Sequence, residues 1–195
     1  MSKLLDNYDC VIITALVQEL PAEDLPLPIY YSGIGKINAA MTTMQIIQQL
    51  QPKIIINYGT AGSVRNDLSG IVRVEKVIQH DIDLRELGFQ LGETPFEEDS
   101  LEIKLDKTIC HLPGLESVTC ASGDQFMTKA PELKSDIVDM EAYAIAKICR
   151  KYQTGFCCFK YISDNANESA NDDWQANIEK GIEKFKALLA QIVAA

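Results

Sequence analysis

Gly155-Phe156-Cys157-Cys158-Phe159-Lys160-Tyr161 is followed directly by Ile162-Ser163-Asp164-Asn165-Ala166-Asn167. The first run is almost wholly apolar, which is typical of a strand that is covered on both faces of a parallel sheet. The polar stretch after it is expected to be the carboxyl end of that strand, opening into a loop. Ligands bind at this edge of open α/β sheets. Asp164 is therefore a candidate for chemistry, although an Asp here could equally cap the next helix.

The rest of the chain alternates between apolar runs and amphipathic stretches. Short apolar runs predict strands at 9–15, 29–31, 53–58, 71–78, 115–121 and 137–140, with 71–78 half-exposed. Helical periodicity predicts helices at 37–50, 141–152 and 172–194, and glycine turns are expected at 32–36 and 59–63. Residues 80–106 are expected to form a long loop, which is usually functional or part of an interface. The pattern predicts one α/β domain over residues 1–195, with a mixed, mostly parallel central sheet flanked by helices.

Composition and charge narrow the class of protein. The chain has 195 residues, of which 47% are hydrophobic and 24% charged, as in an ordinary globular domain. A formal net charge of −10 argues against nucleic acid as the partner. No apolar run approaches the ~20 residues of a membrane span, and residues 1–9 lack the apolar core of a signal peptide, so we expect no membrane association and a cytoplasmic location.

The cysteines and histidines do not predict a metal site. Six cysteines and two histidines are present, and none forms a C-x-x-C pair. Cys157 and Cys158 are adjacent, so on a strand they point to opposite faces. We expect the cysteines to be reduced and mostly in the core, and no metal to be bound.

Acidic and small residues recur at the predicted strand ends. Because the ends of parallel strands share one edge, such side chains can converge on one pocket; the candidates are Glu19, Thr60, Asp124, Glu141 and Asp164. Glu141 could instead favour the dipole of the helix that it begins, and Glu19 could simply be solvated. No Ser or Cys nucleophile with a paired His is evident, so carboxylates without metal-spaced histidines indicate acid–base chemistry, such as cleavage of a glycosidic bond.

The glycine turn at 32–36 does not match a nucleotide-binding motif. Ile37 stands where a P-loop needs Ser or Thr, and the third glycine of a dinucleotide fingerprint is absent. Taken alone, the turn could be a tight strand–helix connection or a loop that cradles a ligand.

Five motifs in order nevertheless resemble a known superfamily. They are Ser32-Gly33-Ile34-Gly35-Lys36, Asn57-Tyr58-Gly59-Thr60-Ala61-Gly62, Ser122-Gly123-Asp124-Gln125-Phe126, Val138-Asp139-Met140-Glu141-Ala142 and Ile162-Ser163-Asp164. Together they resemble the purine nucleoside phosphorylase/nucleosidase superfamily, most of all the 5'-methylthioadenosine/S-adenosylhomocysteine nucleosidases. The likeness extends from about Val11 to the last helix.

The resemblance implies a role for each matched residue in a metal-independent reaction that needs no cofactor. Asp164 would protonate N7 of the purine, and Glu19 would position or deprotonate the attacking water. Thr60 would lie near that water and the ribose. The remaining substrate contacts would be Phe126 stacking on the purine, the Met127 backbone at its edge, and Met140 with Glu141 at the ribose.

The 5' end of the substrate would meet an apolar pocket. The resemblance implies that Leu16, Ile34 and Trp174 line it, and that Leu84 and Leu87 reach it from the neighbouring subunit of a homodimer. Leu16 and Trp174 stand where the family often has Met and Phe. This leaves open another 5' substituent, as in futalosine- or adenosylhopane-type nucleosidases.

Two departures from the family pattern bear on activity. Only twelve residues separate Glu19 from Ser32, so the domain is shortened there, and Lys160 replaces an arginine that is common in the family. The expected function is hydrolysis of the N-glycosidic bond of a 5'-modified adenine nucleoside, with release of adenine. The alternatives are a phosphorolytic purine nucleoside phosphorylase and a non-catalytic nucleoside-binding protein. Hydrolysis is favoured because the glycine turns carry no arginine to hold phosphate, since Arg65 and Arg73 lie beyond them.

Overall fold

The computed structural model describes residues 9–97, 101–167 and 170–194, so the expectation for the first eight residues lies outside the described chain. The strands are β1 (Cys10–Thr14), β2 (Ile29–Tyr31), β3 (Ile54–Ser63), β4 (Ile71–Gln79), β5 (Ile103–Lys104), β6 (Ser117–Ser122), β7 (Ile137–Asp139) and β8 (Gly155–Asp164). The helices are α1 (Lys36–Leu50), α2 (Ala142–Lys151), α3 (Ala170–Ala194) and the short 3-10 helix η1 (Arg85–Leu87).

The strands form one mixed sheet whose centre is the parallel pair β3–β8. β1 lies beside β3, β2 continues that edge, and β8 pairs with β4 on its other side. Because β4 pairs with β6, β6 with β7 and β7 with the end of β3, the pairings close into a ring. Most of these pairings are parallel, which confirms the predicted fold class.

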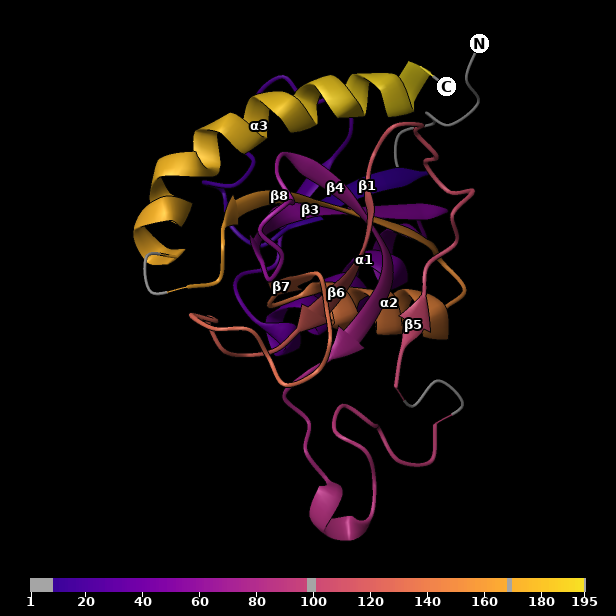
Figure 1. The fold of residues 1–195 in the computed structure, drawn as a ribbon. Coiled ribbons are helices and arrows are strands. Elements are labelled where there is room, and N and C mark those ends of the chain that lie inside the picture. The colour runs from indigo at the N-terminus through magenta and orange to yellow at the C-terminus, as the bar shows by residue number, and fades with distance from the viewer. Residues whose placement is uncertain (1–8, 98–100, 168–169, 195) are drawn as a thin grey trace.

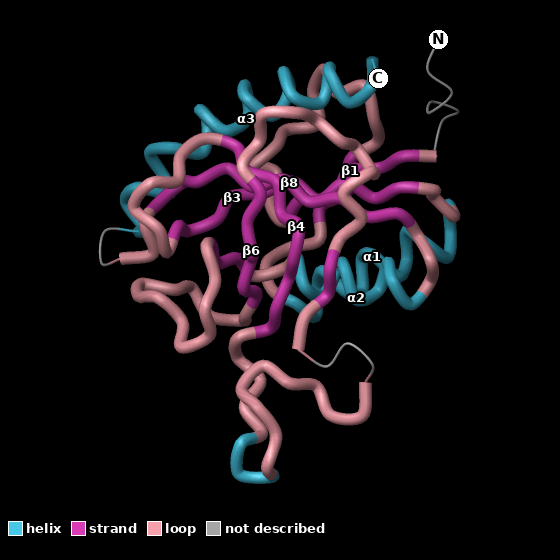
Figure 2. Tube along the Cα trace, turned by 45° about the vertical axis from the view of Figure 1, so that its right-hand side comes forward, coloured by secondary structure: helices cyan, strands magenta, loops and turns pink. Residues whose placement is uncertain are grey.

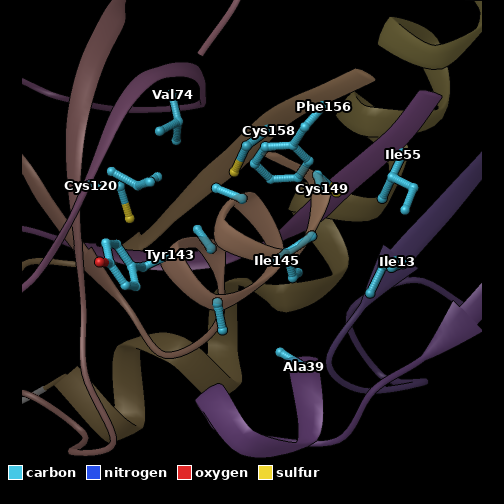
Figure 3. Packing of buried hydrophobic residues seen from close by; sticks show 14 of the residues in the cluster. Ile13, Ala39, Ile55, Val74, Cys120, Tyr143, Ile145, Cys149, Phe156 and Cys158 are labelled. Carbon is cyan, nitrogen blue, oxygen red and sulfur yellow. The ribbon is translucent and has the colours of Figure 1, made fainter. Parts of the chain in front are cut away.

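Helices cover the sheet on both faces (Figures 1 and 2). On one face lies α3, where Phe185 stacks on Tyr58 with ring centroids 4.0 Å apart. On the other face lie α1 and α2. The sheet therefore has one hydrophobic core on each face, and Figure 3 shows residues of the core beside α1 and α2, including Ile55 and Tyr143. Neighbouring residues of β3 alternate between the two cores, because successive side chains of a strand point to opposite faces.

One expected turn is strand instead. Residues 59–63 continue β3, because this strand remains paired with β8 as far as Gly62. Residues 162–164 form the carboxyl end of β8, as expected. The prediction of half-exposure for 71–78 was also wrong: most of β4 is buried, because helices pack against both faces of the sheet there. The residues that end these strands are therefore held by ladder hydrogen bonds rather than by loops.

Part of the apolar surface remains uncovered. On α1, the buried residues are Ala39, Thr43, Ile46 and Ile47, whereas Ile37 and Met41, two of the apolar residues whose period predicted this helix, are 72% and 60% exposed. The long loop between β4 and β5 projects from the body with η1 near its tip (Figure 1) and carries the exposed Leu87 and Phe96. None of the helices in the described ranges is long and apolar enough to cross a membrane.

Candidate active site

A pocket of about 210 Å³ opens at the carboxyl ends of β1, β3 and β8. The ten residues that the sequence nominated within one subunit all line it: Leu16, Glu19, Ile34, Thr60, Phe126, Met127, Met140, Glu141, Asp164 and Trp174. Asp124, the remaining strand-end candidate, is not among the lining residues; its carboxylate accepts the Lys36 N–H on the outer side of the glycine turn. One end of the sheet thus collects the acids and the apolar side chains.

Glu19 is buried, with 6% exposure, so its interpretation as a solvated acid is wrong. Its Oε1 accepts the Thr60 N–H at 2.8 Å and the Thr60 hydroxyl at 2.6 Å. Its Oε2 accepts the Leu16 N–H at 3.2 Å and the Thr14 hydroxyl at 3.4 Å. A hydrogen bond from the Glu19 N–H to the Leu16 carbonyl oxygen closes the turn after β1. This turn directs the Glu19 side chain toward β3, where it meets Thr60.

Gly59 lies between Glu19 and Lys160. A Cβ on Gly59 would lie 3.2 Å from Nζ of Lys160, which is tight, and 3.4 Å from Oε1 of Glu19, which is an ordinary contact. The glycine of the Asn-Tyr-Gly-Thr sequence therefore has a packing reason: it leaves room for the buried lysine.

Glu141 occupies the N-cap position of α2, yet its side chain does not cap the helix. Its Oε1 accepts the N–H of Gly35 at 2.9 Å, which ties the first glycine turn to the pocket wall. Gly35 has φ of +96°, a conformation that side chains rarely adopt, so the turn depends on glycine. Burial, and after it the nearby Asp139 carboxylate, raises the pKa of Glu141 above its ordinary value.

Asp139 and Lys160 form a buried ion pair next to Glu141. The sequence alone assigned neither residue a role in the site. Lys160 Nζ lies 2.8 Å from Oδ2 of Asp139, and both side chains are 1% exposed. The same carboxylate caps α2 by accepting the N–H of Ala142 at 2.9 Å, and it also accepts the Ser122 hydroxyl. Burial opposes the charge on Asp139, but Lys160 outweighs it and lowers the pKa of this carboxyl.

A signal for this ion pair was present in the sequence. Lys160 interrupts an otherwise apolar strand, and lysine is almost never fully buried unless it is paired. Its partner could not be identified, because Asp139 lies on a strand that is not adjacent to β8 in the sheet order.

Asp164 ends β8 and is buried, with 7% exposure. It accepts the Ser163 hydroxyl at 2.7 Å and the Ala166 N–H at 2.9 Å. It is not the N-cap of α3, because that helix begins at Ala170. Burial raises the pKa of Asp164, although its hydrogen bonds act in the opposite direction. A Cβ on Gly62 would approach its Oδ1 to 2.8 Å, so this position too requires glycine.

Apolar side chains complete the wall and the mouth of the pocket. Ile34 and Phe126 are 50% and 47% exposed, whereas Leu16, Met127 and Met140 are partly buried. An exposed aromatic ring beside a cavity is suited to stacking on a flat ligand. No group of three or more potential metal ligands occurs within the part of the chain that the structure describes.

Comparison with known proteins identifies the family. The family model described as the phosphorylase superfamily matches residues 23–194. The chain belongs to the phosphorylase superfamily. It is 35% identical over 167 residues to a 5'-methylthioadenosine/S-adenosylhomocysteine nucleosidase of Staphylococcus saprophyticus, covering 76% of this chain and 73% of that protein. It is 30% identical over 181 residues to an aminodeoxyfutalosine nucleosidase of Helicobacter pylori, covering 84% and 78%.

Among solved structures, this phosphorylase-superfamily chain is similar to the Helicobacter pylori 5'-methylthioadenosine/S-adenosylhomocysteine nucleosidase with butyl-thio-DADMe-Immucillin-A. The TM-score is 0.85 at 25% identity, over 97% of this chain and 99% of the other. The fold and the motif order thus agree with the resemblance that the sequence indicated.

Arg65 and Arg73, which follow β3 in the chain, are both paired outside the pocket. Arg65 forms ion pairs with Asp67, Glu116 and Asp136, and Arg73 donates to backbone carbonyls of residues 106–110. Neither residue lines the pocket, and the described lining residues include no Lys or Arg. The pocket wall therefore offers carboxylates but no cationic side chain.

We predict that Lys160→Met lowers the free energy of unfolding by about 3–5 kcal/mol, because it leaves Asp139 as a buried, uncompensated charge. Urea denaturation measures the change. The double variant Lys160→Met/Asp139→Asn should recover part of the loss, and Lys151→Met, at an exposed position on α2, should stay within about 0.5 kcal/mol of wild type. A double variant no more stable than Lys160→Met would contradict the ion pair as the cause.

Proposed function

We propose that the protein hydrolyses the N-glycosidic bond of a 5'-substituted adenosine and releases adenine. The observation that carries this proposal is the convergence of Glu19, Glu141 and Asp164 on one pocket with an apolar wall. The apolar wall suits the flat purine and an apolar 5' substituent. Cleavage of the bond between base and ribose needs an acid for the leaving base and a base for the attacking water, and the carboxylates can supply both. The relatives named above are nucleosidases.

Each carboxylate is assigned one part of the reaction. Asp164 protonates N7, so that the base leaves as a neutral molecule while positive charge builds on the ribose. Glu19 orients the attacking water or takes its proton, with Thr60 beside it. Glu141 and Met140 hold the ribose, Phe126 stacks on the purine, and the Met127 backbone meets its edge.

Hydrolysis is favoured over phosphorolysis by charge. A phosphate dianion needs charge-assisted donors, and the pocket wall instead presents carboxylates. Glu19 would repel phosphate at the position where it would accept a hydrogen bond from water. A non-catalytic nucleoside-binding protein is disfavoured because the raised pKa of Asp164 suits a proton donor rather than a mere contact.

The size of the 5' substituent depends on Leu16, Ile34 and Trp174. All three line the same cavity, and none is charged, which suits a thioether better than a free 5' hydroxyl. Residues 1–195 are proposed to form one nucleosidase domain shortened between Glu19 and Ser32. A cytoplasmic location is proposed because all six cysteines are unpaired, as is usual in a reducing compartment.

A homodimer is proposed from the uncovered apolar surface. Ile37 and Met41 on α1 and Leu87 on the projecting loop are each at least 60% exposed. Ile37 and Met41 lie four residues apart, so they share one face of α1, and an exposed apolar face usually marks an interface. In such a dimer, Leu84 and Leu87 would complete the 5' pocket of the neighbouring subunit.

The first test is to incubate the protein with 5'-methylthioadenosine and to follow free adenine in phosphate-free buffer. Wild type should release adenine without added phosphate. Asp164→Asn and Glu19→Gln should each lower kcat by about 10²–10⁴, because each removes an acid–base group. Glu19→Gln should retain substrate binding in calorimetry, since Glu19 acts on the water. An absolute need for phosphate, with ribose 1-phosphate as product, would establish the phosphorylase instead.

The pH dependence follows from the raised pKa of Asp164. The general acid works while protonated, so kcat/KM is retained below this pKa and falls as the pH rises through it. Because burial raises the pKa, the fall should begin at a higher pH than an ordinary Asp would give. The residual activity of Asp164→Asn should lack this alkaline fall, whereas Glu141→Gln should keep it. The same alkaline fall in Asp164→Asn would assign the proton to another group.

Sedimentation velocity tests the dimer. Met41→Glu places a charge in the exposed apolar surface of α1 and should shift the protein toward monomer by at least tenfold in dissociation constant, since burying an unpaired charge is costly. Gln191→Glu, an exposed position on α3 at the opposite face of the sheet (Figure 1), is the matched control and should remain dimeric. A wild type that sediments as a monomer at all concentrations would refute the proposal.

A further inference from the structure

Trp174 is the single tryptophan of the chain and lies near the start of α3, partly buried at the edge of the pocket. Its indole Nε1–H donates a hydrogen bond to Oγ1 of Thr60 at 2.8 Å. The Thr60 hydroxyl in turn donates to Oε1 of Glu19 at 2.6 Å. A chain of two hydrogen bonds therefore runs from the last helix, across the end of β3, to the acid after β1.

The direction of this chain is fixed by chemistry. An indole N–H can only donate, so Oγ1 of Thr60 must use a lone pair to accept it. A hydroxyl has one proton, and a carboxylate can only accept, so that proton points to Glu19. Because each bond polarises the next, the indole strengthens the bond that Thr60 makes to the acid.

The hydrogen bonds to Glu19 leave it little freedom. Two donors meet each of its oxygens, and the two on Oε1, at 2.6 and 2.8 Å, are shorter than the two on Oε2, at 3.2 and 3.4 Å. Three of the four donors come from the backbone or from the buried Thr14. The Thr60 hydroxyl is the only one of the four that lines the pocket through a side chain that can rotate. The orientation of Glu19 toward the pocket is therefore most sensitive to what holds this hydroxyl.

We propose that Trp174 is a positioning residue for the reaction: by binding the Thr60 hydroxyl, its indole N–H keeps the proton of Thr60 on Glu19 and so holds the carboxylate in its working orientation. This rests on the proposed hydrolytic function and adds to it. A phenylalanine at this position would fill similar space but could not donate. The orientation of the Glu19 carboxylate thereby depends on the packing of the first part of α3 against β3. Trp174 also remains part of the wall of the 5' pocket.

The first test separates this role from simple packing by kinetics. Trp174→Phe keeps an aromatic ring in the pocket and removes the donor, so kcat should fall by roughly 3- to 10-fold, the effect of one hydrogen bond, and should fall by a larger factor than KM changes. Thr60→Val should lower kcat further, and adding Trp174→Phe to it should cost nothing more, because both changes interrupt one chain. In the Thr60→Ser background, Trp174→Phe should cost as much as in wild type.

A matched variant controls for loss of an aromatic ring. Phe126→Leu removes a ring from the same pocket without touching the chain, and it should act mainly on KM. Additive effects of Trp174→Phe and Thr60→Val on kcat, or a normal kcat in Trp174→Phe, would overturn the positioning role.

The second test does not require activity. A ¹⁵N-labelled protein gives one indole N–H resonance, because Trp174 is the only tryptophan. Thr60→Val should shift this resonance upfield and speed its exchange with solvent, whereas Thr60→Ser should leave it near the wild-type position. An unchanged resonance in Thr60→Val would disprove the bond. If wild type released no base from any purine nucleoside, the proposed function would fail, and this resonance would still decide whether the chain exists.

Discussion

The parallel pairing of β3 with β8 is the constraint on which the site depends. It runs without interruption from Ile54 and Gly155 to Ala61 and Ile162 and shifts register only before Asp164. Thr60 and Asp164 are therefore brought to one end of the sheet by backbone hydrogen bonds, not by loop conformation. Such rigidity suits a site whose acid and base must be held within a fraction of an ångström. It also explains the glycines, since Gly59 and Gly62 lie where a Cβ would crowd Lys160 and Asp164.

Gathering acids at one sheet edge has an electrostatic cost. Glu19, Asp139, Glu141 and Asp164 are all less than 9% exposed. Lys160 compensates one of them directly, and the pairing with Asp139 also fixes the N-terminus of α2, where Glu141 begins. The ion pair therefore stabilises the fold and also the site. Without Lys160, Asp139 would be an unpaired buried negative charge next to Glu141, the residue proposed to hold the ribose.

Much of this arrangement could be predicted from the sequence, because period-2 and period-3.6 patterns locate buried elements well. Strand ends carrying acids pointed to one edge, and the order of the five motifs identified the family. The extent of β3 was missed, since residues such as Gly59 and Gly62 are typical of turns and only their pairing makes them strand. The apolar pattern of α1 was misleading for a related reason: periodicity shows which residues are apolar but not what covers them.

Interactions between distant segments were the least predictable. The contact of Asp139 with Lys160 and the bond from Trp174 to Thr60 join elements far apart in the chain, and no local pattern specifies either. At Trp174 the sequence showed a change of side chain from Phe and suggested only a change of pocket shape. The structure adds the chemical difference, because an indole can donate where a phenyl ring cannot.

The two acids assigned to catalysis are prepared in different ways. Asp164 is buried at the end of a strand, and that burial raises its pKa, which helps a carboxyl to keep a proton for the base. Glu19 is surrounded by four donors that fix the direction of its oxygens, which suits a group that must accept from a small and mobile water. Different surroundings for two carboxyls are how one site separates an acid from a base. Of the four donors, the Thr60 hydroxyl is the one whose orientation depends on another element, so the last helix contributes to the chemistry through the single indole that reaches it.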